Sequence, residues 1–211
     1  MSLDKDLKEA ISRLPSDEKD KLIFRLLRKD SNLVDRLYFE LVSCDSKEDR
    51  RNETKKQIEE RLAVTKRHIK YSTPGLMMME MRDATGVINQ HVKTTKDKYG
   101  EIYLQLFLLK EYLKIYNDFF KGSSAKKSHK LNMYCIAKAF KIMILLKKMH
   151  EDLLFDFVDD ITEIGRLFGD NPLLMNASTH NGLDVNWLIG NKIPENIDKI
   201  EKDLRLQGYL K

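Results

Sequence analysis

Apolar side chains recur every three or four positions along nearly the whole chain. The clearest run is Ile102, Leu106, Leu109, Leu113, Tyr116 and Phe120. That spacing places all six side chains on one face of a helix and would scatter them over both faces of a strand. Helix breakers are few, with 9 glycines and 4 prolines in 211 residues. The pattern predicts one all-α domain over residues 1–211, with about eight helices in an irregular bundle or helical array and no β-sheet.

Breaks in this pattern divide the start of the chain into three short predicted helices. The first carries Leu3, Leu7, Ile11 and Leu14 and ends at Pro15, which cannot continue the helical hydrogen bonds. Ser16 is the expected N-cap of the second helix, and residues 30–32 separate the second helix from the third. We expect the second and third helices to bury an apolar face each. The residues of these faces are Leu22, Ile23, Leu26 and Leu27, and then Leu33, Val34, Leu37, Tyr38 and Leu41.

Capping patterns mark the next two helices. Ser46 with Asp49 three residues later matches a capping box, which opens a long polar helix. Thr73 followed by Pro74 predicts another start, because proline fits the first helical position. We expect that helix to end or bend at Gly100.

The second half of the chain contains one flexible break and one irregular stretch. Residues 122–125 read Gly-Ser-Ser-Ala and are a possible subdivision of the domain. Residues 131–164 contain neither glycine nor proline, and they predict two helices parted near His150 rather than one long bent helix. Residues 169–193 are rich in Asn, Ser, Thr, Gly and Asp, so we expect them to be irregular. A last short helix is predicted from Pro194.

No motif for catalysis, cofactor binding or metal binding is present in the sequence. His150-Glu151 begins like a zinc-protease signature, but Leu154 stands where the second histidine belongs. Phosphate loops, dinucleotide fingerprints and nucleophile elbows are missing as well. His91 lies on an otherwise apolar stripe, and we interpret it as a hydrogen-bonded core histidine, with a ligand role as the alternative. We therefore expect no catalytic residue, no metal and no cofactor, and catalysis without a signature is the alternative.

Apolar runs and cysteine spacing bear on the compartment of the protein. The longest apolar run, Ile142–Leu146, falls far short of the roughly 20 residues that a membrane helix needs. The chain also begins without the pattern of a signal peptide. Cys44 and Cys135 lack metal-ligand spacing, which predicts two reduced, buried thiols. These features favour a cytoplasmic protein without a membrane partner.

The charge pattern between residues 121 and 163 is asymmetric. Residues 121–150 hold eight lysines and no acid, whereas residues 151–163 hold six acids and no base. One helical stripe contains Lys127, Lys130, Lys138, Lys141 and Lys148, and another contains Asp152, Asp156, Asp159 and Glu163. We predict that the acidic stripe packs beside the lysine stripe and partly neutralises it. The alternative is a basic face for nucleic acid or another polyanion, with contacts from Lys127, Lys130, Lys138 and Lys141.

Three stretches of the sequence resemble a bacterial all-helical family catalogued only as a domain of unknown function. The opening stretch is Leu7-Lys8, Leu14-Pro15-Ser16-Asp17-Glu18 and Leu22-Ile23, followed by Leu33-Val34 and Tyr38-Phe39. The other two are residues 104–120 and residues 161–170. The likeness extends to about residue 175, although the sequence departs from it after Asp170. The resemblance implies an all-helical fold and brings no activity with it.

Abundant helical surface without a catalytic constellation favours an interaction or scaffold protein. We expect a non-enzymatic protein of the bacterial cytosol whose partner is another protein. The alternative is a polyanion-binding or nucleic-acid-binding protein that uses the lysine-rich helix of residues 126–148. The methionine-rich stretch 77–81 is interpreted as core packing, with an adaptable binding surface as the alternative. The sequence leaves the oligomeric state open.

Overall fold

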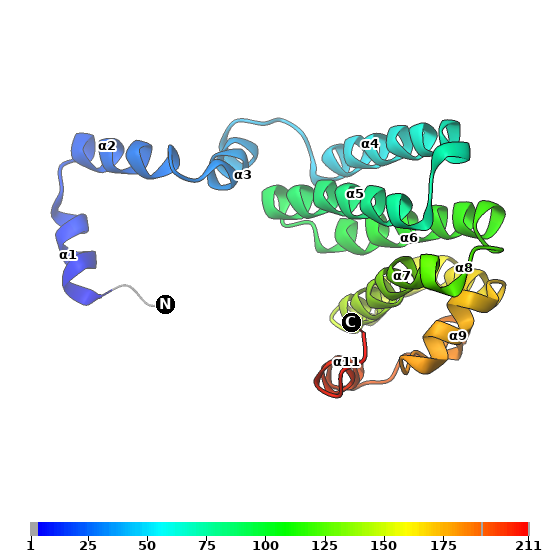
Figure 1. Cartoon of the computed structure of the whole chain (residues 1–211). Helices are drawn as coiled ribbons and strands as arrows, with labels where there is room; N and C mark the ends of the chain where they lie inside the picture. The colour runs from blue at the N-terminus through cyan, green and yellow to red at the C-terminus, as the bar shows by residue number, and fades with distance from the viewer. Residues whose placement is uncertain (1–3, 191, 211) are drawn as a thin grey trace.

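The computed structural model describes residues 4–190 and 192–210, and within them it contains eleven α-helices and no strand (Figure 1). The predicted all-α class is confirmed, but the expected number of eight helices is too low. Two of the additional helices lie in the stretch 169–193, which was predicted to be irregular. Leu3, which was expected in the first helix, lies outside the described residues.

The first three helices form an arm that extends from the rest of the molecule. They are α1 (Lys5–Arg13), α2 (Ser16–Leu27) and α3 (Ser31–Leu41). Figure 1 shows α1 and α2 apart from the helices that follow α3, whereas α3 lies beside one end of α5 (Pro74–Thr95). Gln90 Nε2 of α5 donates a hydrogen bond of 2.9 Å to Asp35 Oδ2 of α3. Ser16 is the first helical residue of α2 and not its N-cap, which is Pro15.

The prediction that α2 and α3 bury their apolar faces is wrong. No residue of the three arm helices is buried. Phe24 is 60% exposed, Tyr38 61% and Leu41 77%. An amphipathic pattern shows that a helix has an apolar face, but it does not say which surface covers that face.

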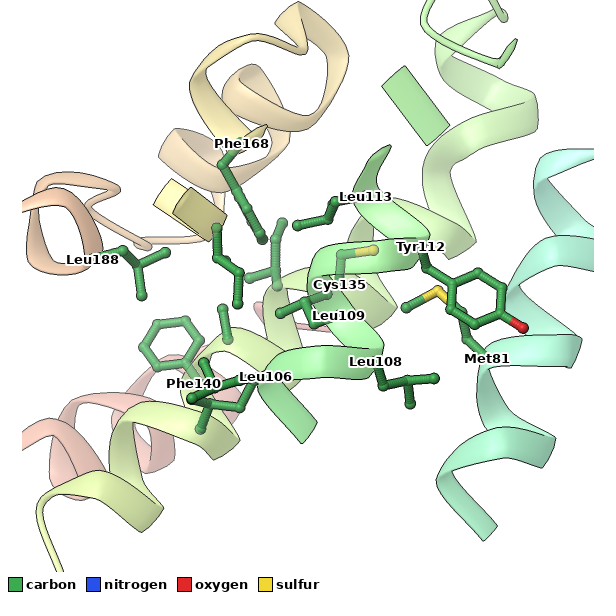
Figure 2. Close-up of a cluster of buried hydrophobic side chains, with 14 of the residues drawn as sticks. Met81, Leu106, Leu108, Leu109, Tyr112, Leu113, Cys135, Phe140, Phe168 and Leu188 are labelled. Carbon is green, nitrogen blue, oxygen red and sulfur yellow. The ribbon is translucent and has the colours of Figure 1, made fainter. Parts of the chain in front are cut away.

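The remaining helices form a body with its own hydrophobic core. They are α4 (Lys47–Arg67), α5, α6 (Lys98–Phe119), α7 (Ala125–Leu146), α8 (Val158–Gly169), α9 (Pro172–His180), α10 (Asn186–Ile189) and α11 (Ile197–Leu206). Helix α6 is central, because it packs against α4, α5, α7 and α8. All six residues of the stripe that begins at Ile102 are buried, as predicted. Figure 2 shows side chains from α5, α6, α7, α8 and α10 meeting in this core.

Local capping signals predicted several helix ends correctly. Ser46 and Asp49 form the expected capping box at the start of α4, and Thr73 caps α5. The boundary near Gly100 is different from the prediction. Helix α5 already ends at Thr95, and Asp97 caps α6, so Gly100 lies inside the first turn of α6. The polar residues at 94–97 close one helix and open the next without a glycine.

The second half of the body follows one prediction and contradicts another. Helices α7 and α8 are separate, with the short 3₁₀ turns η2 (Glu151–Leu153) and η3 (Phe155–Phe157) between them, so the predicted break near His150 is confirmed. The stretch 169–193 is more regular than predicted, since α9 and α10 make up about half of it. Asn171 accepts hydrogen bonds from two backbone N–H groups at the start of α9. Much of the polar composition of this stretch therefore belongs to caps and exposed helix faces.

Candidate functional site

A groove runs along one face of α7, with α5 on one side and α11 on the other. It consists of two adjoining hollows of about 520 and 420 Å³ that share Tyr134 and Ala137. Residues of α5 and of the chain after Asn196 line the sides. Helix α7 contributes His129, Lys130, Met133, Tyr134, Ala137, Lys138, Lys141, Ile144 and Leu145, and the turn after it contributes Lys148.

Helix α7 exposes its groove side because its apolar residues are concentrated on the opposite side, which packs in the core. The core side carries apolar residues at helical spacing, including Leu131, Ile136 and Phe140, all fully buried. On the groove side, Tyr134 Oη lies 2.9 Å from Thr85 Oγ1 of α5, and this hydrogen bond joins the two helices at the floor. Thr85 Oγ1 also donates to the backbone carbonyl of Met81 at 2.7 Å. The floor is therefore held in place by packing and by hydrogen bonds between elements.

Positive charge predominates along the groove. Four Lys or Arg side chains line the larger hollow and two line the smaller, against the single carboxylate of Glu201. Two of these cations already have partners. Lys141 Nζ lies 2.9 Å from Glu101 Oε1 of α6, and Arg205 pairs with Glu201 within α11. An anionic ligand would reduce the remaining repulsion among the cations.

Lys138 differs from the other lysines because it is buried. Only 5% of the residue is exposed, and its Nζ donates a hydrogen bond to Gln105 Oε1 of α6. The ammonium nitrogen also lies 5.7 Å from the centre of the Tyr134 ring. Burial, followed by the charge of Lys141, lowers the pKa of Lys138 to about 7.

The structure brings together three of the four lysines predicted as polyanion contacts. Lys130, Lys138 and Lys141 line the groove, whereas Lys127 lies exposed in the first turn of α7 and does not line it. Sequence reasoning missed Arg82 of α5 and Arg205 of α11. No local pattern connects these two arginines to the lysine stripe, because only the packing of three distant segments makes them neighbours.

The predicted pairing of the acidic stripe with the lysine stripe is wrong. Asp156 Oδ2 accepts a hydrogen bond from Tyr99 Oη at 3.2 Å, and Asp152 Oδ2 lies 3.1 Å from His150 Nδ1. Among the described residues, no ion pair joins an acid of this stripe to a lysine of the other. The physical reason is the packing order. Helix α8 packs mainly on α6, α9 and α10, and α6 also packs against α7, so the two stripes have different neighbours.

Other candidate residues of the sequence have structural roles. The buried His91 lies with its Nε2 3.3 Å from Asp97 Oδ2, which confirms the interpretation as a hydrogen-bonded core histidine. Cys135 is buried and free, and burial raises its thiol pKa to about 12. Cys44 is exposed, so the prediction of two buried thiols is half wrong. Within the described residues, no group of His, Cys, Asp or Glu is placed to hold a metal ion.

A scan against protein-family models found no match, and comparisons with curated proteins and with solved structures found none either. No helix in the described part of the chain combines the length and the apolar character needed to cross a membrane.

Proposed function

We propose that this protein is a non-enzymatic interaction protein whose groove on α7 binds an acidic amphipathic helix of a partner protein. The observation that supports it best is an apolar floor combined with cationic edges in one linear groove. Tyr134, Ala137, Ile144 and Leu145 form the floor and are only partly buried. Apolar side chains of a partner helix at positions i, i+3, i+4 and i+7 would cover them.

The dimensions of the groove suit a helix. Within α7 the lining extends from Lys130 to Leu145, and a rise of about 1.5 Å per residue separates these two residues by about 22 Å. A partner helix of roughly four turns would span that distance. Carboxylates beside its apolar face would lie near Arg82, Lys130 and Lys148. The charge pattern would steer an acidic helix toward the groove and disfavour a basic one.

Polyanion or nucleic-acid binding is the second candidate function. It is favoured by the finding that the acidic stripe does not neutralise the lysine stripe. Three of the groove cations are nevertheless poorly placed for phosphate, because Lys138 is buried and Lys141 and Arg205 already have carboxylate partners. Arg82, Lys130 and Lys148 would have to supply most of the phosphate contacts. An apolar floor also suits a partner helix better than a phosphate backbone.

The test is site-specific photo-crosslinking in the native host, with a photoreactive amino acid at position 148 on the groove edge. The expected result is a covalent adduct to an acidic, amphipathic segment of another protein, identified by mass spectrometry. The Lys130→Glu variant should lose the adduct, whereas Lys56→Glu on the exposed side of α4 should keep it. Adducts to nucleic acid would support the second function instead. Crosslinks to unrelated segments that survive Lys130→Glu would contradict the groove as a binding site.

A further inference from the structure

The apolar face of α2 is uncovered. Its residues Ile23 and Leu26 are exposed, as is Phe24 along its edge, and Leu22 and Leu27 are only partly buried. Figure 1 shows α2 joined to α1 at one end and to α3 at the other, with no helix of the body along its length. A continuous patch of large apolar side chains on a protein surface marks a contact with another molecule.

The two ends of α2 differ in charge, which makes its surface self-complementary. Residues 16–21 hold three acids and two lysines, whereas residues 22–29 hold three bases and no acid. This order suits the dipole of α2 itself, because the acids lie near its N-terminus and the bases near its C-terminus. It also means that a second copy of α2, laid antiparallel on the first, presents its basic end to the acidic end.

The two lysines of the acidic end have partners within the arm. Lys19 Nζ donates a hydrogen bond of 2.9 Å to the backbone carbonyl of Ser12 in α1. Lys21 Nζ lies 3.1 Å from Glu18 Oε1. Since these lysines are held by groups of their own chain, the remaining carboxylates of the acidic end are free to meet the bases of another molecule.

We infer that α2 pairs antiparallel with α2 of a second copy of this chain, about a two-fold axis near Phe24. Helical spacing then places Leu22 opposite Leu26 of the second copy and Phe24 opposite its own counterpart. Asp20 lies opposite Arg28 of the second copy, and the symmetry repeats this ion pair on the other side of the axis. Both side chains are exposed, and among the described residues neither has an ion-pair partner in its own chain. Two ion pairs therefore flank an apolar centre.

The α7 groove of a second copy is the competing surface for this face. Its edges are mainly cationic, so they would repel the basic end of α2 and leave Arg28 without a partner. Antiparallel pairing also brings α1 of each copy to the end where α3 of the other begins. The exposed Leu7 of α1 and Tyr38 of α3 then extend the apolar contact. This extension is needed because a stable interface uses roughly 20–30 residues of each partner, and α2 alone has 12.

Sedimentation equilibrium of the full chain over a range of concentrations tests this pairing. The expected result is a reversible monomer–dimer equilibrium, with a mass that rises from 24.8 kDa toward twice that value. Leu26→Ser should weaken dimerisation about tenfold, because it removes apolar contact area in both copies. Asp20→Arg and Arg28→Asp should each weaken it about tenfold, since each places like charges opposite one another twice in the dimer. An equimolar mixture of these two charge variants should regain an affinity close to that of the parent, because both ion pairs form again in the mixed dimer.

Matched controls separate this pairing from other contacts. Asp118→Arg makes the same charge change at an exposed position near the end of α6 and should leave the equilibrium unchanged. Lys130→Glu in the α7 groove should leave it unchanged as well. Because the contact is small and reversible, hydrogen exchange in a dilute sample reports the uncovered α2, and protection of its amides should rise with concentration.

Four outcomes would overturn the inference. The first is the mass of a single copy at every concentration, and the second is a dimer that Asp20→Arg does not weaken. The third is a mixture of the two charge variants that stays monomeric. The fourth is loss of the dimer in Lys130→Glu, which would place the arm of the second copy in the α7 groove. Thermal unfolding of each variant separates a lost contact from a lost fold.

Discussion

Asp97 connects three helices at the residue scale. Its Oδ2 accepts a hydrogen bond from Arg51 Nε of α4 at 2.8 Å and lies 3.3 Å from His91 Nε2 of α5. Its Oδ1 accepts from the Gly100 backbone N–H at 2.9 Å and so caps α6. Burial opposes the charged form, but the hydrogen bonds from His91 and Arg51 outweigh it and hold the pKa of Asp97 well below its usual range.

Replacing Asp97 by alanine should therefore lower the free energy of unfolding by about 3 kcal/mol at pH 7, because it leaves a partly buried guanidinium without its partner. A carboxylate with a depressed folded pKa stabilises the protein above its unfolded pKa of 3.8 and loses that effect as the pH falls further. Urea denaturation at pH 7, 5 and 3.5 measures the difference between parent and variant. The difference in unfolding free energy between parent and variant should be smaller at pH 3.5 than at pH 7. The same difference at all three pH values would contradict a stabilising role of the ionised Asp97 carboxylate. Asp45→Ala, at an exposed residue, is the control.

The side chain of Asp97, which caps α6, lies so close to residue 100 that only glycine fits there. A Cβ atom on Gly100 would lie 2.0 Å from Asp97 Oδ2 and 2.8 Å from Arg51 Nε. We expect Gly100→Ala to destabilise the protein by about 2 kcal/mol, even though alanine usually favours a helix. Gly86→Ala is the matched control in α5, because nothing lies within 4 Å of the added atom. It should stabilise the protein by about 0.5 to 1 kcal/mol in the same urea titration. Equal effects at both positions would show that the cap does not determine the residue at 100.

The lowered pKa of the buried Lys138 leads us to expect an unusual dependence of stability on pH. Its folded pKa of about 7 lies below the unfolded value of 10.5, so the unfolded chain binds more protons between these values. The contribution of Lys138 to the free energy of unfolding should therefore rise with pH across this range. The neighbouring charges of Lys141 and Glu101 act in opposite directions on it, and Cys135 lies one turn earlier on α7.

Lys138→Met removes the ionisable group and keeps a side chain of similar length. It should stabilise the protein by about 2 kcal/mol more at pH 6 than at pH 9. Chemical denaturation at the two pH values gives the comparison, and Lys127→Met at an exposed position should show no such difference. A Lys138→Met effect that is the same at both pH values would mean that Lys138 is not buried in solution.

The arm helices carry the clearest prediction at the scale of elements. Helices α1 and α2 have 9 and 12 residues and bury no side chain. Isolated helices shorter than about 12 to 15 residues are marginally stable in water. In hydrogen exchange, amides of α1 and α2 should exchange orders of magnitude faster than those of α6. Strong protection of α1 and α2 would mean that another surface covers their apolar faces in solution.

Helix boundaries were predictable where the signal was local. The capping box at Ser46 and the Thr73-Pro74 start involve neighbouring residues only, and both were found as expected. The stretch 169–193 was misinterpreted because Asn, Ser and Asp serve as caps as well as loop residues. Asn171 and Pro172 together start α9, whose Leu174 is fully buried. Burial of Leu174 is a tertiary fact, and composition alone does not contain it.

For the whole molecule, the body should fold without the arm. The described hydrophobic core begins at Ile58, and α3 reaches the body mainly through α5. A chain that lacks residues 1–42 should unfold cooperatively and lose no more than about 2 kcal/mol, because it loses only partly exposed contacts. Thermal and urea denaturation of the shortened and full chains provide the measurement. Loss of cooperative unfolding would show that the arm is part of the folding unit.

The sequence by itself determined the all-α class, the starts of α4 and α5 and the inward face of α6. These features depend on helical spacing and on hydrogen bonds between residues a few positions apart, so they are present in any short window. Tertiary structure alone decided which apolar faces are covered, which charges pair and where the two hollows lie. Arg82, Lys138 and Arg205 are far apart in the chain and meet only because α5, α7 and α11 pack together. That arrangement is stabilised by packing between segments that are distant in the sequence, so no short stretch of sequence predicts it.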